Sequence, residues 1–412
     1  MPTSLKFTLS TVVMMTLCLT SINMKFSLTM GHMEFYLATL YSAFILLFIF
    51  VVKQKLLLRS VDGIIKAFVW WIIFELMLVI LMVFFKDISL LCLLDELIVF
   101  MLPLIVCIIF KYYSNYWRGI YLTLITIGNL VAIQAIIYTF IYSLAISYLG
   151  WGDNKFGEGL ARADTTIGAA TSSSVFLFST VVICLLLISK KLSMPVRNYV
   201  IFSLIFILFG QLVLQTRSGL MMSGIVLFSF LMQEKNKKYR KYFIIAFFMV
   251  LIYLIYYQSE LISEFIGRLN QTDSYTANSD DLRRELFENG IRKFLDNPIF
   301  GGGFGQGLGR IRDIRELRDV MYNPHNQYLA FGIDFGIIGL LIVLLIIFRM
   351  LKHYYSRTKN RLLVIAFLCM LLISFNTESM FTSELRTCIA VWNILFAIAI
   401  EKQQYLRKQI YE

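Results

Sequence analysis

The sequence predicts an all-helical, polytopic membrane protein. Of its 412 residues, 58% are hydrophobic and 16% are charged, and the mean hydropathy is +0.74. A soluble core could not bury that much apolar surface. About twelve apolar segments recur along the chain, the longest exceeding the roughly 20 residues that a spanning helix needs and several falling short of it. We therefore expect about twelve transmembrane helices.

The expected spans follow from the apolar segments in chain order. They comprise residues 8–24, 35–52, 64–85, 88–110, 119–141, 173–189, 198–215, 219–232, 243–258, 328–348, 362–376 and 387–400. The six cysteines lie within or beside these segments and form no C-x-x-C pair, which is typical of small buried hydrophobic residues. Neither a disulfide framework nor a zinc site is predicted.

The distribution of positive charge predicts the orientation. If the N-terminus is cytoplasmic, the connections on that side hold more than half of the 38 lysines and arginines. The short connections on the other side hold only six, which are Lys25, Lys86, Lys155, Arg162, Arg217 and Arg386. The positive-inside rule then predicts an even number of spans with both termini in the cytoplasm.

This topology divides the chain into three parts. Residues 1–259 hold the first nine spans, residues 260–327 form one large extracytoplasmic loop with short helices, and residues 328–412 hold the last three spans and a cytoplasmic tail. A single large loop on a compact membrane protein is usually functional.

The large loop is rich in arginine. Residues 281–296 repeat leucine and isoleucine at helical spacing, with Asp280 placed to cap the helix. Residues 310–321 alternate apolar residues with arginines, among them Arg312, on a second short helix. The loop holds eight arginines and one lysine. Arginine binds phosphate and carboxylate in a bidentate manner, so the loop is predicted to meet an anionic ligand, although each single arginine could also be a solvated surface charge.

A glycine-rich stretch, NPIFGGGFGQGLGR, lies between these two helices at residues 297–310. Its spacing does not fit a dinucleotide-binding fingerprint, and no strand precedes it. Two interpretations stay open: a tight backbone path whose amides face a diphosphate, or a flexible turn.

Two further positions are chemically suggestive. Arg217, in LQTRSGL, falls between the seventh and eighth apolar segments, where a charge is costly and indicates either a functional partner or a side chain that reaches the interface. His325 stands directly before the tenth segment. Histidine is the side chain whose ordinary pKa suits a general base near neutral pH, although an isolated histidine is more often structural.

These residues carry a family resemblance. His325-Asn326, nine residues, and then Gly336-Ile-Ile-Gly339 match the H-[NSQ]-x9-G-x-x-G signature, and Asn297-Pro298 opens a similar glycine-rich approach. In this the chain resembles O-antigen ligases, protein O-oligosaccharyltransferases and Wzy-type O-antigen polymerases. We also expect the two motif glycines, one turn apart, to let the tenth helix pack closely against another span.

The resemblance implies a metal-independent, inverting glycosyltransferase of GT-C-like architecture in a bacterial inner membrane, with its active site on the periplasmic side. His325 would act as the base, and Arg217 and Arg283 would neutralise a diphosphate leaving group. The residues expected to bind the diphosphate or glycan are Arg284, Asn326, Arg162, Arg312 and Arg386. The tandem of Arg283 and Arg284 leaves the choice between them open.

The partners implied are an undecaprenyl-diphosphate-linked oligosaccharide, a glycan acceptor, membrane lipid and, as a further candidate, a chain-length regulator. No cofactor, metal or nucleic acid is expected, since the first outer connection offers only His32 and Glu34 for a metal. We favour a polysaccharide polymerase, for O-antigen or capsule, whose acceptor is a lipid-linked repeat unit. The alternative is an O-antigen ligase in lipopolysaccharide biosynthesis, whose acceptor is lipid A-core, and no residue decides between them.

A transporter or flippase is the rival class. Its support is a set of carboxylates inside apolar segments, Glu75, Asp95, Glu96 and Asp334, that could relay protons. Such a function would explain neither the arginines of the outer side nor His325.

Overall fold

The computed structural model describes residues 27–30, 33–36, 77, 117–140, 165, 170–190, 192–214, 216–233, 240–241, 274–302, 324–358, 361–377, 394, 397–398 and 401. The first four expected spans, the ninth and the twelfth lie outside these residues, apart from a few single positions and one short strand pair. Most of the described residues are helical.

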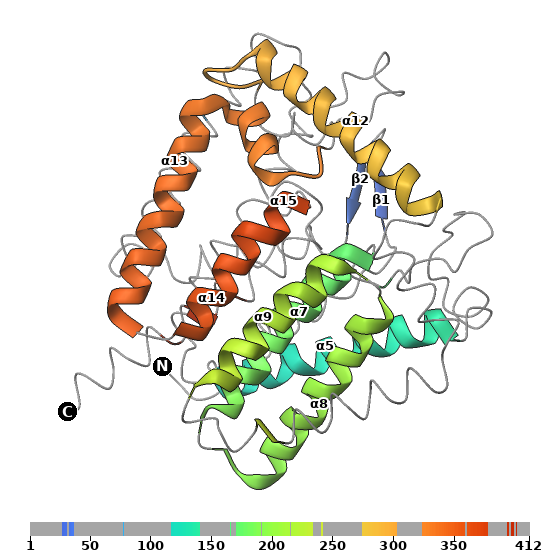
Figure 1. Ribbon diagram of the computed structural model, residues 1–412, viewed down its shortest axis with the longest axis vertical. Helices are drawn as coiled ribbons and strands as arrows, with labels where there is room; N and C mark the ends of the chain where they lie inside the picture. The colour runs from blue at the N-terminus through green and yellow to red at the C-terminus, as the bar shows by residue number, and fades with distance from the viewer. Residues whose placement is uncertain are drawn as a thin grey trace.

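Four helices form the first half of the described fold. They are α5 (Trp117–Phe140), α7 (Ala170–Ile188), α8 (Met194–Val213) and α9 (Arg217–Met232). Each coincides with an expected apolar segment to within a few residues, so a helix is confirmed at all four positions. Helices α5, α7 and α8 are long enough to span a membrane, whereas α9 is a shorter apolar helix. Helix α7 packs against α5, α8 and α9, and nearly all of its side chains are buried (Figure 1).

The protein is a membrane protein. Helices α5, α7, α8 and the first part of α13 are long and apolar enough to cross a membrane. Large apolar side chains on α8 and α9 face outward, with Phe202 67% and Phe228 63% exposed. Such a surface is stable in lipid and would be unfavourable in water.

The second half of the described fold adds a helix of the large loop and two expected spans. Its elements are α12 (Ser274–Asp296), α13 (Gln327–Thr358), α14 (Arg361–Cys369), the π-helix η4 (Met370–Ser374) and α15 (Phe375–Thr377). Helices α14 and η4 pack against α9, α15 against α13, and α13 against α12. In Figure 1, α12, α15 and the start of α9 lie toward the upper end of the bundle.

Two local predictions are corrected. Helix α12 begins at Ser274, so Asp280 lies inside the helix and does not cap it. No glycine or proline lies between residues 274 and 281 to end the helix earlier, whereas Pro298 follows its predicted end at Asp296. The all-helical prediction fails at β1 (Ser27–Met30) and β2 (Met33–Tyr36), which pair antiparallel with Ser27 opposite Tyr36.

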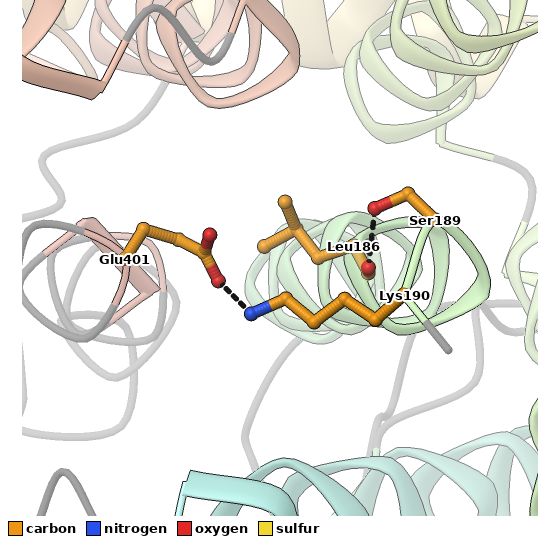
Figure 2. Close-up of polar contacts among 4 residues, drawn as sticks. All are labelled: Leu186, Ser189, Lys190 and Glu401. Carbon is orange, nitrogen blue, oxygen red and sulfur yellow. Dashed lines mark hydrogen bonds and ion pairs between the residues drawn. The ribbon is translucent and has the colours of Figure 1, made fainter. Parts of the chain in front are cut away.

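An ion pair joins two distant parts of the chain at the end of α7 (Figure 2), and a contact with an aromatic ring adds a third. The ammonium of Lys190 pairs with the Glu401 carboxylate. The same ammonium lies 4.1 Å from the centre of the Trp117 ring. The neighbouring Ser189 hydroxyl donates to the Leu186 carbonyl at 2.6 Å. Trp117, Lys190 and Glu401 belong to, or directly adjoin, connections and a tail that the charge pattern assigns to one side of the membrane.

Candidate active site

Arg217 is the first residue of α9. Helix α8 ends at Val213, and the Leu214 amide still donates to the Gly210 carbonyl at 3.1 Å. The N-cap residue Thr216 is extended, and its carbonyl accepts the Leu220 amide at 3.3 Å. The Arg217 side chain is exposed at the helix end where the backbone amides carry partial positive charge.

The corner that carries Arg217 is braced by Gln211 of α8. This fully buried side chain donates through Nε2 to the Ser174 carbonyl of α7 at 2.9 Å and to the Gly219 carbonyl of α9 at 3.1 Å. One amide group therefore ties three helices together beside Arg217.

Close packing between α7 and α9 completes this corner. A Cβ atom on Gly219 would lie 1.8 Å from Ser174 Oγ and 2.8 Å from Ser174 Cβ. Atoms of real side chains do not approach so closely, so the absence of a side chain at Gly219 is what lets the two helices meet here.

His325 occupies a tight turn immediately before α13. Its φ of 46° is the only positive value at a non-glycine residue in the described part of the chain. This left-handed conformation is uncommon outside glycine, and histidine is among the residues that tolerate it. The ring is partly exposed, while Pro324 before it is buried.

Asn326 caps the helix that follows. Its Oδ1 accepts the Leu329 amide at 3.0 Å, and its carbonyl accepts the Ala330 amide at 3.0 Å, the pattern of an N-cap. Its Nδ2 donates to Asn376 Oδ1 of α15 at 3.3 Å. The structure therefore gives the predicted ligand-binding Asn326 a structural task.

The start of α13 contacts the π-helix η4 and helix α15. The Tyr328 hydroxyl donates to the Leu371 carbonyl at 2.8 Å. The side-chain Nδ2 of Asn376 donates to the Leu372 carbonyl at 2.8 Å. The rings of Tyr328 and Phe375 meet edge to face at 5.8 Å between centres. These contacts hold the turn containing His325 against η4 and α15. The π-helix η4 in turn packs on α9.

The two tandem arginines of α12 lie in different surroundings. Arg283 is partly buried and shares one helix face, at i+3 and i+7, with the buried Leu286 and Gly290. A Cβ atom on Gly290 would lie 3.0 Å from Pro324 Cβ, so this face packs against the turn of His325. Arg284 has an 80% exposed side chain, and its Nε pairs with Glu288 Oε1 one turn along at 3.1 Å.

The motif glycines do not serve the predicted packing between spans. Gly336, with φ 64° and ψ −171°, interrupts α13, and its Cβ position falls against the backbone of Ile299. At Gly339, the space for a Cβ is occupied by Phe335 of the same helix. The prediction failed because close packing between helices and a helix break both require glycine, and the spacing does not distinguish them.

The elements that carry the candidate residues are connected by packing, directly between α12 and α13 and through intervening helices for α9. Arg217 starts α9, which packs against α14 and η4; His325 precedes α13, which packs against α15 and α12; and Arg283 lies on α12. Asp334 is fully buried in the first part of α13. The predicted residues Arg162, Arg312 and Arg386 lie outside the described residues, as do Glu75, Asp95 and Glu96.

Residue-by-residue reading of the sequence missed Gln211 and Asn376. A signal existed for both, because each is an amide inside or at the end of a predicted span, where an unsatisfied polar group is costly. The sequence does not indicate which carbonyl groups these side chains bond.

Residues 202–344 match the family model of the O-antigen ligases. The resemblance predicted from the histidine motif is therefore confirmed for this segment. It runs from α8 through α9 and α12 into α13, and it contains Arg217, Arg283, His325 and both motif glycines. A search among curated proteins finds no match to the chain.

Proposed function

We propose that this protein is a glycosyltransferase that moves a glycan from an undecaprenyl-diphosphate carrier to an acceptor hydroxyl on the periplasmic side of a bacterial inner membrane. The observation that carries the proposal is the match of residues 202–344 to the O-antigen ligases. Within this segment Arg283 and His325 belong to packed neighbours, α12 and the start of α13, and Arg217 on α9 is linked to α13 through α14, η4 and α15. The predicted architecture of about twelve GT-C-like spans, with residues 260–327 as the periplasmic loop, belongs to the same proposal.

The arginines are assigned to the diphosphate. Arg217 combines a guanidinium with the positive end of α9, and both favour an anion at the membrane edge. Arg283 is the better second ligand, because its face of α12 packs toward His325 while Arg284 faces solvent and pairs with Glu288. Arg284, Asn326, Arg162, Arg312 and Arg386 remain candidates for contacts with the glycan or diphosphate.

His325 is assigned as the base. The acceptor oxygen attacks the anomeric carbon, a new C–O bond forms, and the bond from that carbon to the diphosphate oxygen breaks. The acceptor proton passes to the imidazole, and undecaprenyl diphosphate leaves against the two arginines. Attack opposite the leaving group inverts the anomeric centre. The left-handed backbone of His325 supports this role, since such backbone strain clusters at functional sites.

The proposed topology has independent support in the cluster around Lys190. Trp117, Lys190 and Glu401 come from three parts of the chain that an even number of spans would place in the cytoplasm, and they lie together. Both termini would then be cytoplasmic.

Polymerase and ligase remain two candidate functions. The compact loop favours the polymerase, whose acceptor is a lipid-linked repeat unit. The description of the matching family, O-antigen ligase, favours transfer to lipid A-core. Purified protein incubated with undecaprenyl-diphosphate repeat units alone separates them. A ladder of longer lipid-linked chains identifies a polymerase, and transfer that occurs only when lipid A-core is added identifies a ligase.

The residue assignments have their own test. His325→Ala, Arg217→Ala and Arg283→Ala should each reduce transfer at least about a hundredfold, the scale of a lost general base or charge stabiliser, whereas Arg284→Ala should keep most of the activity. Normal insertion with full transfer in the first two variants would refute the site. Ion-dependent uptake into proteoliposomes without a transfer product would show that the protein is a transporter and not an enzyme.

A further inference from the structure

Helix α13 consists of two limbs that meet at Gly336. The first limb, residues 327–335, is largely buried, whereas the second exposes apolar side chains such as Ile337 and Leu341. The φ and ψ of Gly336, 64° and −171°, fall in a region that only glycine occupies readily. The break therefore separates the short limb that follows His325 from the longer limb that suits lipid.

The segment after α12 fills this break with its own backbone. In an unbroken helix the Ile337 amide would donate to the Ile333 carbonyl. Here the Ile337 amide donates to the Pro298 carbonyl at 2.9 Å, and the Ile333 carbonyl accepts the Gly302 amide at 2.7 Å. The Ile338 amide likewise donates to the Ile299 carbonyl at 3.4 Å. We call this crossing of residues 297–302 with residues 333–338 the backbone clasp.

Two glycines make the clasp sterically possible. A Cβ atom on Gly336 would lie 2.2 Å from the Ile299 carbonyl oxygen and 2.6 Å from the Gly301 nitrogen. A Cβ atom on Gly301, whose φ is 78°, would lie 2.3 Å from the Asp334 carbonyl oxygen and 2.5 Å from the Gly336 nitrogen. All four neighbours are backbone atoms, so no side-chain rotation can relieve the contact.

The clasp also decides between the two interpretations of the glycine-rich stretch at its start. The Gly301 amide donates to the Asn297 carbonyl at 2.9 Å, and the Gly302 amide to the Ile333 carbonyl. Both donors are used inside the fold. These two glycines therefore shape a tight backbone path and are not an anion-binding nest.

The clasp sits where it controls the register of α12 on α13. Helix α12 ends at Asp296, and the clasp begins with the next residue. Further up α12, Gly290 faces Pro324 and Leu329, while the Phe294 ring would lie 3.1 Å from a Cβ on Gly332. The clasp thus lies at the C-terminal end of the interface between α12 and α13. Arg283 lies on the same face of α12, toward its N-terminal end.

We infer that Gly301 and Gly336 are positioning residues, which fix Arg283 of α12 relative to His325 of α13 by joining the main chains of the two elements. The inference deepens the proposed function and rests on it for the roles of Arg283 and His325. It also unites two separate sequence features, the Asn-Pro glycine stretch and the first glycine of the histidine motif, in one construction.

The experiment measures distance and activity separately. Spin labels on the exposed positions Leu295 of α12 and Met221 of α9, introduced as Leu295→Cys and Met221→Cys after replacement of the native cysteines, report where α12 lies on the bundle. A second pair, Phe202→Cys and Phe228→Cys, reports on α8 and α9 alone. Gly301→Ala and Gly336→Ala are compared with Gly224→Ala, where a Cβ meets no atom within 4 Å.

The native chain and Gly224→Ala should give one narrow distance for each pair. Gly301→Ala and Gly336→Ala should shift or broaden the α12 distance, leave the control pair unchanged, and lower glycan transfer at least about tenfold, since small misplacements of catalytic groups are costly.

Three outcomes would overturn the inference: an unchanged α12 distance in both glycine variants, full transfer despite a changed distance, or equal disturbance of both label pairs, which would show a purely structural role. Absence of transfer from the native protein would instead refute the proposed function. The distance measurement would still test the clasp, since it needs no substrate.

Discussion

The Arg217 corner and the His325 turn are secured by different parts of the polypeptide. At the Arg217 corner, a side-chain amide bridges three helices and a glycine faces a serine side chain. Beyond the His325 turn, main chain crosses main chain at two glycines. A contact with a side chain can be restored by a compensating substitution. A contact between backbones cannot, because every residue has the same backbone.

The largest effect expected at the Arg217 corner comes from Gly219→Ala. The new Cβ would overlap Ser174, and the separation of α7 and α9 should reduce stability by about 1–3 kcal/mol. Thermal unfolding in detergent measures the loss. Ser174→Gly in the same chain should restore most of it, and Ser174→Ala only part, since Ser174 Cβ alone would still lie 2.8 Å away. If Ser174→Gly restores none of the lost stability, a compensating substitution cannot rescue the Arg217 corner. The proposed difference between the corner and the clasp would then be wrong.

Gln211→Leu should have the next largest effect. Leucine keeps much of the volume but removes both donated hydrogen bonds, which leaves the carbonyls of Ser174 and Gly219 without that donor at a cost of about 1–3 kcal/mol. The same unfolding measurement applies. Gln233→Leu at the far end of α9 is the matched control and should change stability by less than about 0.5 kcal/mol. An equal loss of stability in the two variants would show that Gln211 does not brace the corner.

Asn326→Ala should destabilise the His325 turn by about 1 kcal/mol, the usual value of a helix cap. Two variants divide the side chain's two roles. Asn326→Asp keeps the acceptor for the Leu329 amide and loses the donor to Asn376, whereas Asn376→Ala removes only the bridge to α15. Amide hydrogen exchange at Leu329 should therefore rise in Asn326→Ala and stay near the native rate in Asn326→Asp. Similar protection in all three variants would contradict the cap.

The smallest effect is expected from Arg284→Ala. Its ion pair with Glu288 is exposed on the surface of α12, and such a pair contributes about 0.5 kcal/mol or less. Unfolding in low salt and in high salt should give nearly the same stability for this variant and the native chain. A loss of several kcal/mol would mean that Arg284, and not only Arg283, belongs to the packed face.

Local patterns predicted four of the described helices well. The limits of α5, α7, α8 and α9 follow from the length of each apolar segment, because a spanning helix must satisfy its backbone within one continuous stretch. The start of α12 was misplaced, since a polar helix in a loop has no such requirement. The hairpin of β1 and β2 was also missed; it lies in the expected first connection and reaches the first two residues of the expected second span.

The candidate site was predicted less completely. Arg217, Arg283, Arg284, Asn326 and His325 were all named from residue type and motif. Helices α12 and α13 are packed neighbours, and α9 reaches α13 through α14, η4 and α15. The choice between Arg283 and Arg284 needed the face of α12 that packs on α13, because helical spacing alone makes either face possible. Asn326 proved to be a helix cap, a role that depends on the conformation of the turn before it.

The sequence by itself determined that the chain is a membrane protein with apolar helices, and it identified the histidine motif of a glycan-transferring family. Both depend on residues close together in the chain. Only the tertiary structure decided what the glycines do. Gly219 makes room for Ser174, and Gly301 and Gly336 make room for each other's main chain, across gaps of many residues. A missing side chain leaves no trace in the sequence of which distant atom occupies its place.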